Sequence, residues 1–398
     1  MASGAEFYAY PWDLSDEGVD AAATILSQTL GPGGGVLLAL SYHVSTYFSP
    51  HNPRRKLYYG EEGAVYFVPD ESLYADTAMR PLVSHVVTGS NYMPDLVRGL
   101  QRHDLRFSAW AVYFYNHHLP QAFPDVARRD CFGEPYLAQV CPAAPAARHY
   151  AIALTRDMLR HGPAAIQLES LSYLPCRYGF RNPKVLVDIA PYHEFLLGLC
   201  FCPHCLTAAQ AGGVDADLLR RDVATYLDVA LAVEPAATLM EADLTEQIDV
   251  AFNGRLVQYL EVRTETATSL FEQVAATVHD AGAEATFFGS LDRQVTGLDR
   301  QRVLRCIDAV YTRILGAAEE LPATVSHLRQ DLPDVRLVSI AAPGASSNET
   351  RARIEAEAAA GVDGFAFYTY GLLRRTQIDW IGAAREVWTD NTKDGVAE

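Results

Sequence analysis

An eightfold alternation of short apolar strands with helices most constrains how this chain of 398 residues folds. The expected strands are residues 7–10, 36–40, 107–114, 164–169, 285–288, 309–313, 335–340 and 365–368. Alternating strand and helix units pair their strands in parallel, and eight such units close into a (β/α)8 barrel of the α/β class, a TIM barrel. An open doubly wound sheet is disfavoured because the glycine-rich stretch 31–35 precedes a strand instead of following one. No linker divides the chain, so we predict a single domain over residues 1–398.

Three of the connecting segments are long. We therefore predict elaborated loops after strands 2, 3 and 4. After strand 2, the aromatic runs 57–59 and 65–67 flank Gly60-Glu61-Glu62-Gly63 and predict a β-hairpin. Near the N-terminus, Ser15 is placed to cap a helix that runs to about Leu30.

Three of the seven cysteines, Cys200, Cys202 and Cys205, lie within six residues as C-x-C-x-x-C. Thiolates this close repel one another unless a cation or an oxidant holds them. Zinc takes tetrahedral sulfur ligands and would draw a fourth from elsewhere in the chain. We predict a structural Zn²⁺ that clamps a loop at about residues 170–206, because four thiolates leave no open coordination position. Three inert buried thiols, one disulfide plus a spare thiol, and redox chemistry are the alternatives.

Charge and the N-terminus bear on partners and location. A formal net charge of −17 disfavours a nucleic-acid polymer or an anionic membrane as partner. No apolar run approaches the ~20 residues that span a bilayer, and the first residues lack the pattern of a signal peptide. An odd cysteine count without an export signal is typical of the reducing cytoplasm. We expect a cytoplasmic protein with a small-molecule partner, and homo-oligomer formation stays open.

In (β/α)8 barrels the active site is built at the C-terminal ends of the strands, an end that we call the mouth. Each polar residue there could equally be a solvated residue of the rim, but their joint occurrence favours a functional mouth. The candidates are Trp12 and Asp13 after strand 1, His43 after strand 2, His117 and His118 after strand 3, Glu169 on strand 4, Asp292 and Arg293 after strand 5, Arg313 after strand 6, and Tyr368 and Tyr370 on strand 8.

Glu169 is the strongest of these candidates. A carboxylate that closes an apolar strand is desolvated, and the resulting rise in its pKa suits general acid catalysis or, equally, metal ligation. A salt bridge to Arg177 or Arg313 is the structural alternative. His117 and His118 are adjacent, so on a strand only one of them would point inward.

The cysteine motif shortly after the strand-4 glutamate, together with Val140-Cys141-Pro142, resembles the family 42 β-galactosidases. The resemblance implies a (β/α)8 enzyme with a four-cysteine zinc site beside the mouth, with Cys141, Cys200, Cys202 and Cys205 as ligands. Cys131 and Cys176 remain substitutes for Cys141.

The chain departs from that family at two points. Leu168 stands where the family has an asparagine before its acid/base glutamate. The end of strand 7, Ile340-Ala341-Ala342-Pro343-Gly344, carries no nucleophilic glutamate, and the next carboxylate is Glu349. Asp292 or Asp13 would have to supply the second carboxyl group that glycoside hydrolysis uses.

Three functions follow from this inventory. Two imidazoles and a carboxylate, from His43, His117 or His118, and Glu169, make a ligand set for a mononuclear metal such as Fe²⁺ in a non-haem oxygenase. The alternative is a divergent glycoside hydrolase that uses Glu169 as general acid/base, in which the rings of Trp12, Trp110, Tyr368 and Tyr370 stack on sugar faces. The third is a barrel that binds sugars without catalysis. In the two catalytic functions the substrate is small and polar: a sugar, a nucleoside-like molecule or a heteroaromatic acid.

Overall fold

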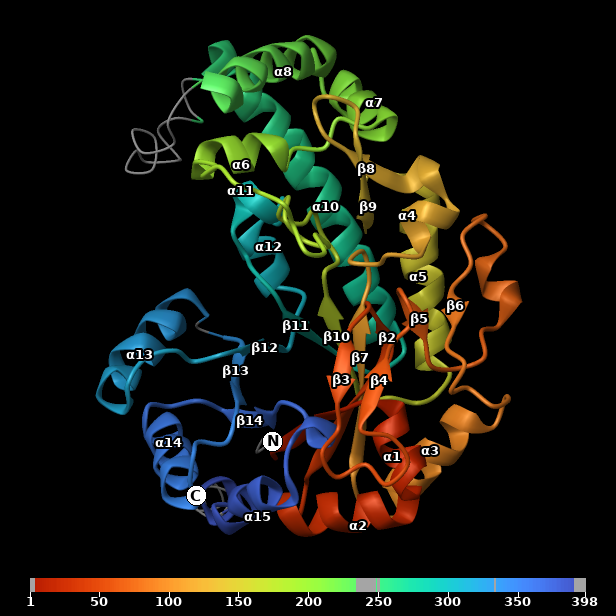
Figure 1. The fold of residues 1–398 in the computed structure, drawn as a ribbon, viewed down its shortest axis with the longest axis vertical. Helices are drawn as coiled ribbons and strands as arrows, with labels where there is room; N and C mark the ends of the chain where they lie inside the picture. Colours follow the sequence, from red (N-terminus) through yellow and green to blue (C-terminus); the bar gives the residue numbers. More distant parts are fainter. Residues whose placement is uncertain (1–3, 234–247, 249–250, 333, 390–398) are drawn as a thin grey trace.

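The structure is a computed structural model that describes residues 4–233, 248, 251–332 and 334–389. Eight strands form a closed parallel barrel (Figure 1). They are β1 (Glu6–Ala9), β2 (Gly35–Tyr42), β7 (Arg106–Val112), β10 (Ala165–Glu169), β11 (Glu284–Phe288), β12 (Ala309–Thr312), β13 (Arg336–Ala341) and β14 (Gly364–Phe367). Each pairs with the next along the chain, and β14 pairs with β1 to close the ring. The predicted fold is therefore confirmed, with all eight strands.

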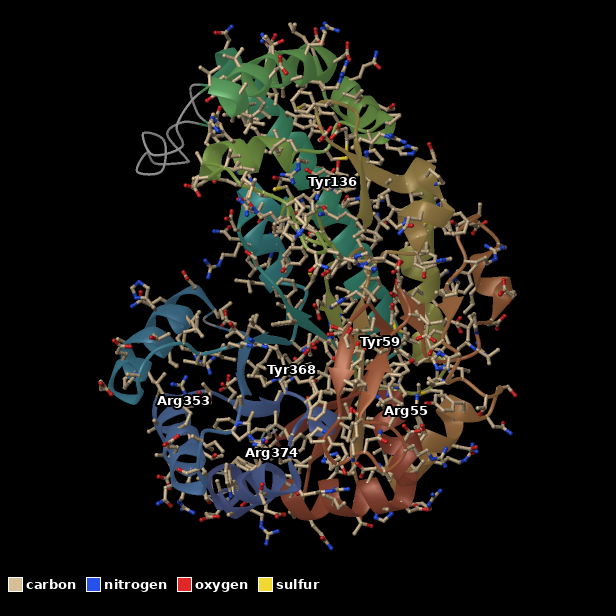
Figure 2. All side chains as sticks on the ribbon, viewed as in Figure 1. Arg55, Tyr59, Tyr136, Arg353, Tyr368 and Arg374 are labelled. Atoms are coloured by element: carbon tan, nitrogen blue, oxygen red, sulfur yellow. The ribbon has the colours of Figure 1, made fainter. Side chains whose placement is uncertain are left out.

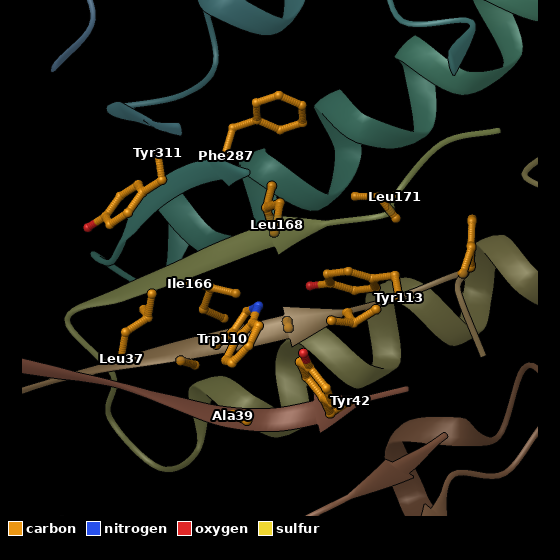
Figure 3. Packing of buried hydrophobic residues seen from close by; sticks show 14 of the residues in the cluster. Leu37, Ala39, Tyr42, Trp110, Tyr113, Ile166, Leu168, Leu171, Phe287 and Tyr311 are labelled. Carbon is orange, nitrogen blue, oxygen red and sulfur yellow. The ribbon is translucent and has the colours of Figure 1, made fainter. Parts of the chain in front are cut away.

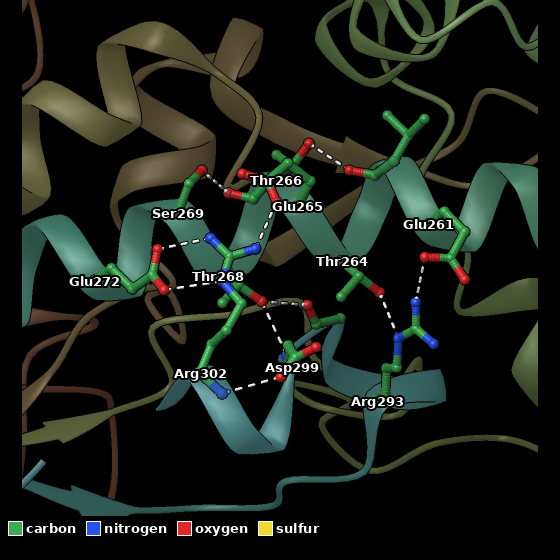
Figure 4. A network of polar contacts seen from close by, with 12 residues as sticks. Glu261, Thr264, Glu265, Thr266, Thr268, Ser269, Glu272, Arg293, Asp299 and Arg302 are labelled. Carbon is green, nitrogen blue, oxygen red and sulfur yellow. Dashed lines mark hydrogen bonds and ion pairs between the residues drawn. The ribbon is translucent and has the colours of Figure 1, made fainter. Parts of the chain in front are cut away.

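Helices surround this barrel. They are α2 (Val19–Leu30), α3 (Tyr92–Arg102), α5 (Pro145–Leu159), α10 (Arg255–Asp280), α12 (Arg300–Leu304), α13 (Leu321–Asp331), α14 (Ser347–Ala359) and α15 (Arg375–Ala383), with short α11 (Arg293–Thr296) and α16 (Glu386–Thr389). Helix α10 packs its buried side on the sheet, where Phe271 contacts Phe287 of β11 with ring centroids 5.7 Å apart. Its outer side is tied to α12, since Arg302 donates to both carboxylate oxygens of Glu272 at 2.8 and 2.6 Å (Figure 4). No helix within the described ranges combines the length and apolarity needed to cross a membrane.

The elaborated loops are confirmed after β2, β7 and β10. The first holds β3 (Thr46–Phe48), β4 (Leu57–Tyr59), β5 (Ala64–Val65) and β6 (Leu82–Val83); the second holds α4 (Leu119–Ala122), β8 (Ala127–Arg129) and β9 (Pro135–Val140); the third holds α6 (Pro191–Leu197), α7 (Pro203–Ala211) and α8 (Ala216–Val233). Helices α6 to α8 and the β8–β9 hairpin gather at the upper end of the molecule in Figure 1, away from α2 and α15.

Two local predictions are wrong. The run 57–59 pairs with β3 and not with 65–67, because the main chain at Tyr66 bonds instead to Leu40 of β2, at 3.0 Å from N to O. Ser15 lies inside a separate helix α1 (Pro11–Glu17), and the expected helix starts again at Val19. The break is at Gly18, whose φ of 89° lies in the region that favours glycine.

Side chains fill the barrel in layers. At the N-terminal end, Glu6 accepts hydrogen bonds from Arg106 at 2.5 Å and from Tyr311 at 2.8 Å. One layer higher, the Tyr8 hydroxyl lies 3.0 Å from the Gln167 side-chain oxygen. Figure 3 shows Trp110 of β7 beside Tyr42 of β2 in this core, with ring centroids 4.5 Å apart. The interior is a packed core, so chemistry is confined to the mouth above it.

Candidate active site at the barrel mouth

Glu169 is the last residue of β10, and its side chain is partly exposed at the mouth. The register places Gln167 opposite Trp110 on β7, which brings the indole under the carboxyl group. Trp110 Nε1 donates to Glu169 Oε2 at 2.6 Å. Burial raises the pKa of Glu169 to about 7, while this hydrogen bond acts in the opposite direction. The carboxyl group therefore holds and releases a proton near neutral pH.

No ion pair to Glu169 exists among the described residues, so the salt-bridge alternative is wrong. Arg177 pairs with Glu194 at 3.0 Å, and the Arg313 guanidinium lies 5.5 Å from the ring centroid of Tyr368. Directly after Glu169, Ser170 adopts a φ of 57°, which is uncommon for a residue with a Cβ and costs about 1 kcal/mol or more. The turn directs the chain out of the barrel at that point.

A row of aromatic rings runs from Trp110 across the mouth. Trp110 contacts Tyr42, Tyr42 stacks on His43, His43 stacks on Tyr115, and Tyr115 contacts Tyr178, with centroid distances of 4.5, 4.3, 4.3 and 5.3 Å. We call these five residues the aromatic row. They come from β2, β7 and the segments that follow β2, β7 and β10, so the barrel brings them into one continuous row beside Glu169, of which Trp110 and Tyr42 are buried.

His43 is held neutral in this row. Burial lowers its pKa to about 4, and its Nδ1 lies 2.8 Å from the Val44 carbonyl oxygen. A ring nitrogen at that distance from a carbonyl oxygen carries the hydrogen and donates, which leaves Nε2 as an acceptor. On the opposite side of β1, the Tyr368 hydroxyl lies 3.3 Å from that of Tyr42.

The two histidines after β7 lie beyond the strand and not on it. His117 is buried, with 5% of its surface exposed, and it lines a cavity beside the mouth. His118 precedes α4 and turns its ring toward Phe123. Across the described residues, His43, His117 or His118, and Glu169 do not form a group whose ligand atoms lie within 4.8 Å of one another. The geometry therefore does not assemble the predicted facial metal set.

Both aspartates offered as a second carboxyl group are engaged in helix contacts. Asp292 is exposed and caps α11, where its Oδ1 accepts from Gln294 N at 2.9 Å. Asp13 is buried in α1, where its Oδ2 accepts from Tyr10 N at 2.9 Å. Burial, opposed by this hydrogen bond, raises the pKa of Asp13 to about 7. After β13, Glu349 accepts from Ala345 N at 2.9 Å as part of the α14 N-terminus.

The four predicted zinc ligands do come together. Cys141 Sγ lies 3.4 Å from Cys202 Sγ and Cys205 Sγ and 3.8 Å from Cys200 Sγ, and all four residues are buried. These sulfurs are too far apart for disulfides, which need about 2.05 Å. Sulfurs held about 2.3 Å from a tetrahedral zinc lie about 3.8 Å apart, so the donor set fits that metal. Cys131 and Cys176 lie outside this cysteine cluster.

Buried polar side chains fix the cluster to the mouth loops. The Tyr173 hydroxyl lies 3.3 Å from Cys205 Sγ, and the Tyr259 hydroxyl donates to the Cys200 carbonyl oxygen. Arg128 of β8 is fully buried and donates to the carbonyl oxygens of Leu174 and Gly198. The loop that follows Glu169 is thereby held to the β8–β9 hairpin.

Sequence reasoning missed the partners that define the site. Trp110 was expected only as a sugar-stacking ring, yet its indole N–H is the group that contacts Glu169. The alternation of side chains along β7 could have revealed this contact. Ser108 and Trp110 lie on the same face of β7, and β7 is the neighbour of β10, which carries Glu169. Tyr115 and Tyr178 carried no such signal, since both lie in loops whose course depends on tertiary contacts.

No family model and no curated protein matches this sequence. Solved structures do match. The β-galactosidase from the psychrophilic Marinomonas ef1 has a TM-score of 0.57 at 11% identity, covering 99% of this chain and 61% of that chain. A family 42 β-galactosidase from G. stearothermophilus has a TM-score of 0.56 at 10% identity, with 98% and 57% covered. The catalytic domain of β-amylase from Paenibacillus polymyxa has a TM-score of 0.52 at 10% identity, with 98% and 99% covered.

This chain thus spans about three-fifths of the length of the two β-galactosidases. At these identities the likeness is one of fold. The chain has the (β/α)8 barrel of these glycoside-hydrolase structures.

Proposed function

We propose that this protein is an enzyme that cleaves a glycosidic bond in a small carbohydrate, with Glu169 as the proton-transferring residue. The observation that carries the proposal is the Trp110–Glu169 hydrogen bond at the mouth, with a carboxyl pKa of about 7. Effective general acids have a pKa near the working pH. The sugar-acting enzymes among the structural neighbours, two β-galactosidases and a β-amylase, support the same substrate class.

In the proposed step the bond between the anomeric carbon and the leaving oxygen breaks, and the Glu169 proton passes to that oxygen. Water forms the new bond to carbon, and its proton returns through solvent to the Glu169 carboxylate. The Trp110 N–H stabilises that carboxylate while it is charged. The Tyr42 and Tyr368 hydroxyls would orient the sugar or the water. A two-carboxylate mechanism is not part of the proposal, since Asp13, Asp292 and Glu349 are held in helix contacts.

We also propose that Cys141, Cys200, Cys202 and Cys205 hold a structural zinc ion. The spacing of the four sulfurs and their burial support it. Four thiolates complete a tetrahedral site, so the metal would fix the loop beside Glu169 and would not touch the substrate.

The test is a panel of aryl glycosides assayed with the wild type, Glu169→Gln and Glu349→Gln. Loss of general acid catalysis typically costs about 10²–10⁴ in rate. We expect that loss for Glu169→Gln alone, because Glu349 serves a helix terminus. Turnover that persists in Glu169→Gln, or that requires added Fe²⁺, would contradict the proposal. Binding of sugars without any turnover would favour a non-catalytic barrel.

A further inference from the structure

A cavity of about 420 Å³ lies beside the mouth, between the β8–β9 hairpin and the loop that follows Glu169. Its lining is mostly apolar, with Tyr136, Leu137 and Phe180 among the residues. The ionisable side chains in the lining include His117, Asp130, Glu134 and Arg177. Figure 2 labels Tyr136 near α6 and the hairpin, and Tyr368 lower down at the barrel. Cavities of this size and lining are typical of sites for small organic groups.

The walls of the cavity are held by buried contacts. Gln139, which is fully buried, donates from its side-chain nitrogen to the carbonyl oxygens of Pro175 at 3.0 Å and Tyr178 at 2.9 Å. Gly179 has a φ of 89°, and a Cβ at this position would lie 2.2 Å from the Ala138 Cβ. Only glycine therefore allows the loop to approach β9 this closely. The cavity is formed before any ligand arrives.

The aromatic row connects the cavity to Glu169. Tyr178 lines the cavity and contacts Tyr115, which in turn stacks on His43 at the mouth. Burial raises the pKa of the Tyr178 phenol, and the negative charge of Glu169 raises it further, which places the two groups within electrostatic reach. His43 and Tyr115 are partly exposed and Tyr178 is exposed, so a ligand that reaches Glu169 at one end can lie along these three rings.

Two further observations point to a ligand. Neither ring nitrogen of buried His117 meets the geometry of a hydrogen bond among the described residues. The Gly179 backbone is nevertheless close enough to raise the pKa of the ring. Leu137 and Phe180 line the cavity while 55% and 50% of their surfaces are exposed. Covering apolar side chains that are exposed to water beside a cavity with an apolar group lowers the free energy and so favours binding.

We propose that this cavity binds an aryl or alkyl group attached to the sugar that reacts at Glu169, so that the substrate is a glycoside with an apolar leaving group. The inference rests on the proposed function for the position of the sugar. It adds the substrate class and a second binding region.

Direct binding tests this without requiring turnover. The probes are methyl and 4-methylumbelliferyl glycosides of the same sugars, and free 4-methylumbelliferone, titrated by calorimetry and by fluorescence. We expect the aryl glycoside to bind at least about tenfold more tightly than its methyl counterpart, and free 4-methylumbelliferone to bind measurably. Leu137→Asp and Phe180→Asp should each weaken aryl binding about tenfold. Leu186→Asp is the matched control, because Leu186 is fully exposed and does not line the cavity.

Equal affinity for methyl and aryl glycosides would overturn the inference, as would aryl binding that is unchanged in both cavity variants. Circular dichroism and thermal unfolding show whether each variant is folded. Running the titrations in Glu169→Gln as well separates the two proposals. If Glu169→Gln still binds the aryl glycoside more tightly than the methyl glycoside, the cavity proposal is supported, whether or not the variant is active. If Glu169→Gln still turns over substrate, only the proposed role of Glu169 is contradicted.

Discussion

The indole Nε1 of Trp110 lies 2.6 Å from Oε2 of Glu169, where the packed core of the barrel gives way to the mouth. Two influences on the carboxyl group oppose each other there. Burial favours the protonated form, and the indole hydrogen bond favours the ionised form. Their balance gives a pKa of about 7, which is the basis of the first prediction.

Trp110→Phe removes the hydrogen bond and keeps an aromatic ring in the core. Because the bond stabilises the ionised form, its loss should raise the pKa of Glu169 further, by about one unit. The measurement is the pH dependence of kcat/KM or, without a substrate, titration of the carboxyl group by infrared difference spectroscopy. An unchanged or lower pKa would show that the indole does not act on the charge of Glu169.

The raised pKa values also predict how stability depends on pH. Glu169 and Asp13 each hold a proton more tightly in the folded chain, with pKa values near 7 against ordinary values near 4. Their contribution to the free energy of unfolding is therefore fully present below about pH 4 and is lost as the pH rises through 7. Glu169→Gln and Asp13→Asn should each reduce the fall in stability between pH 5 and pH 8, by about 1–3 kcal/mol.

Urea unfolding at the two pH values measures this. The pair also separates stability from catalysis, because both variants remove an acid with a raised pKa but only Glu169 is partly exposed at the mouth. Asp13→Asn should keep turnover. Loss of turnover in a well-folded Asp13→Asn would instead return Asp13 to the role of a second carboxyl group.

The proposed zinc site predicts which thiols matter. Cys202→Ser should reduce bound zinc from one per chain to a small fraction, and should lower the melting temperature, because structural zinc contributes on the order of 10 kcal/mol to folding. Cys306→Ser is the control, since Cys306 lies outside the cysteine cluster. Elemental analysis of protein purified without added metal gives the ratio. Unchanged zinc in Cys202→Ser would contradict the assignment.

The barrel could be predicted because its eight strands are short apolar runs with clear periodicity, and closure follows from their number. The pairing of residues 57–59 could not be predicted, because β5 pairs with β2 through main-chain groups, and such pairing leaves no pattern in the side chains. At the site, Glu169 was predictable as a polar end to an apolar strand. The helix contacts of Asp13 and Asp292 were not predictable, because only the folded backbone defines these local hydrogen bonds.

His43 allows the sharpest test between the proposed glycosidase and a metal enzyme. Its pKa of about 4 keeps the imidazole neutral at physiological pH, and its ring lies between Tyr42 and Tyr115 at 4.3 Å from each. If the ring serves to keep the aromatic row continuous, His43→Phe should preserve turnover within about threefold. His43→Ala should lose about tenfold or more, since it removes two stacking contacts of about 0.5–1.5 kcal/mol each. A metal ligand would give a different result for His43→Phe. Phenylalanine cannot bind a metal, so both variants would then lose turnover together with a second, non-zinc metal, and side-by-side kinetics and elemental analysis of the two variants distinguish these outcomes.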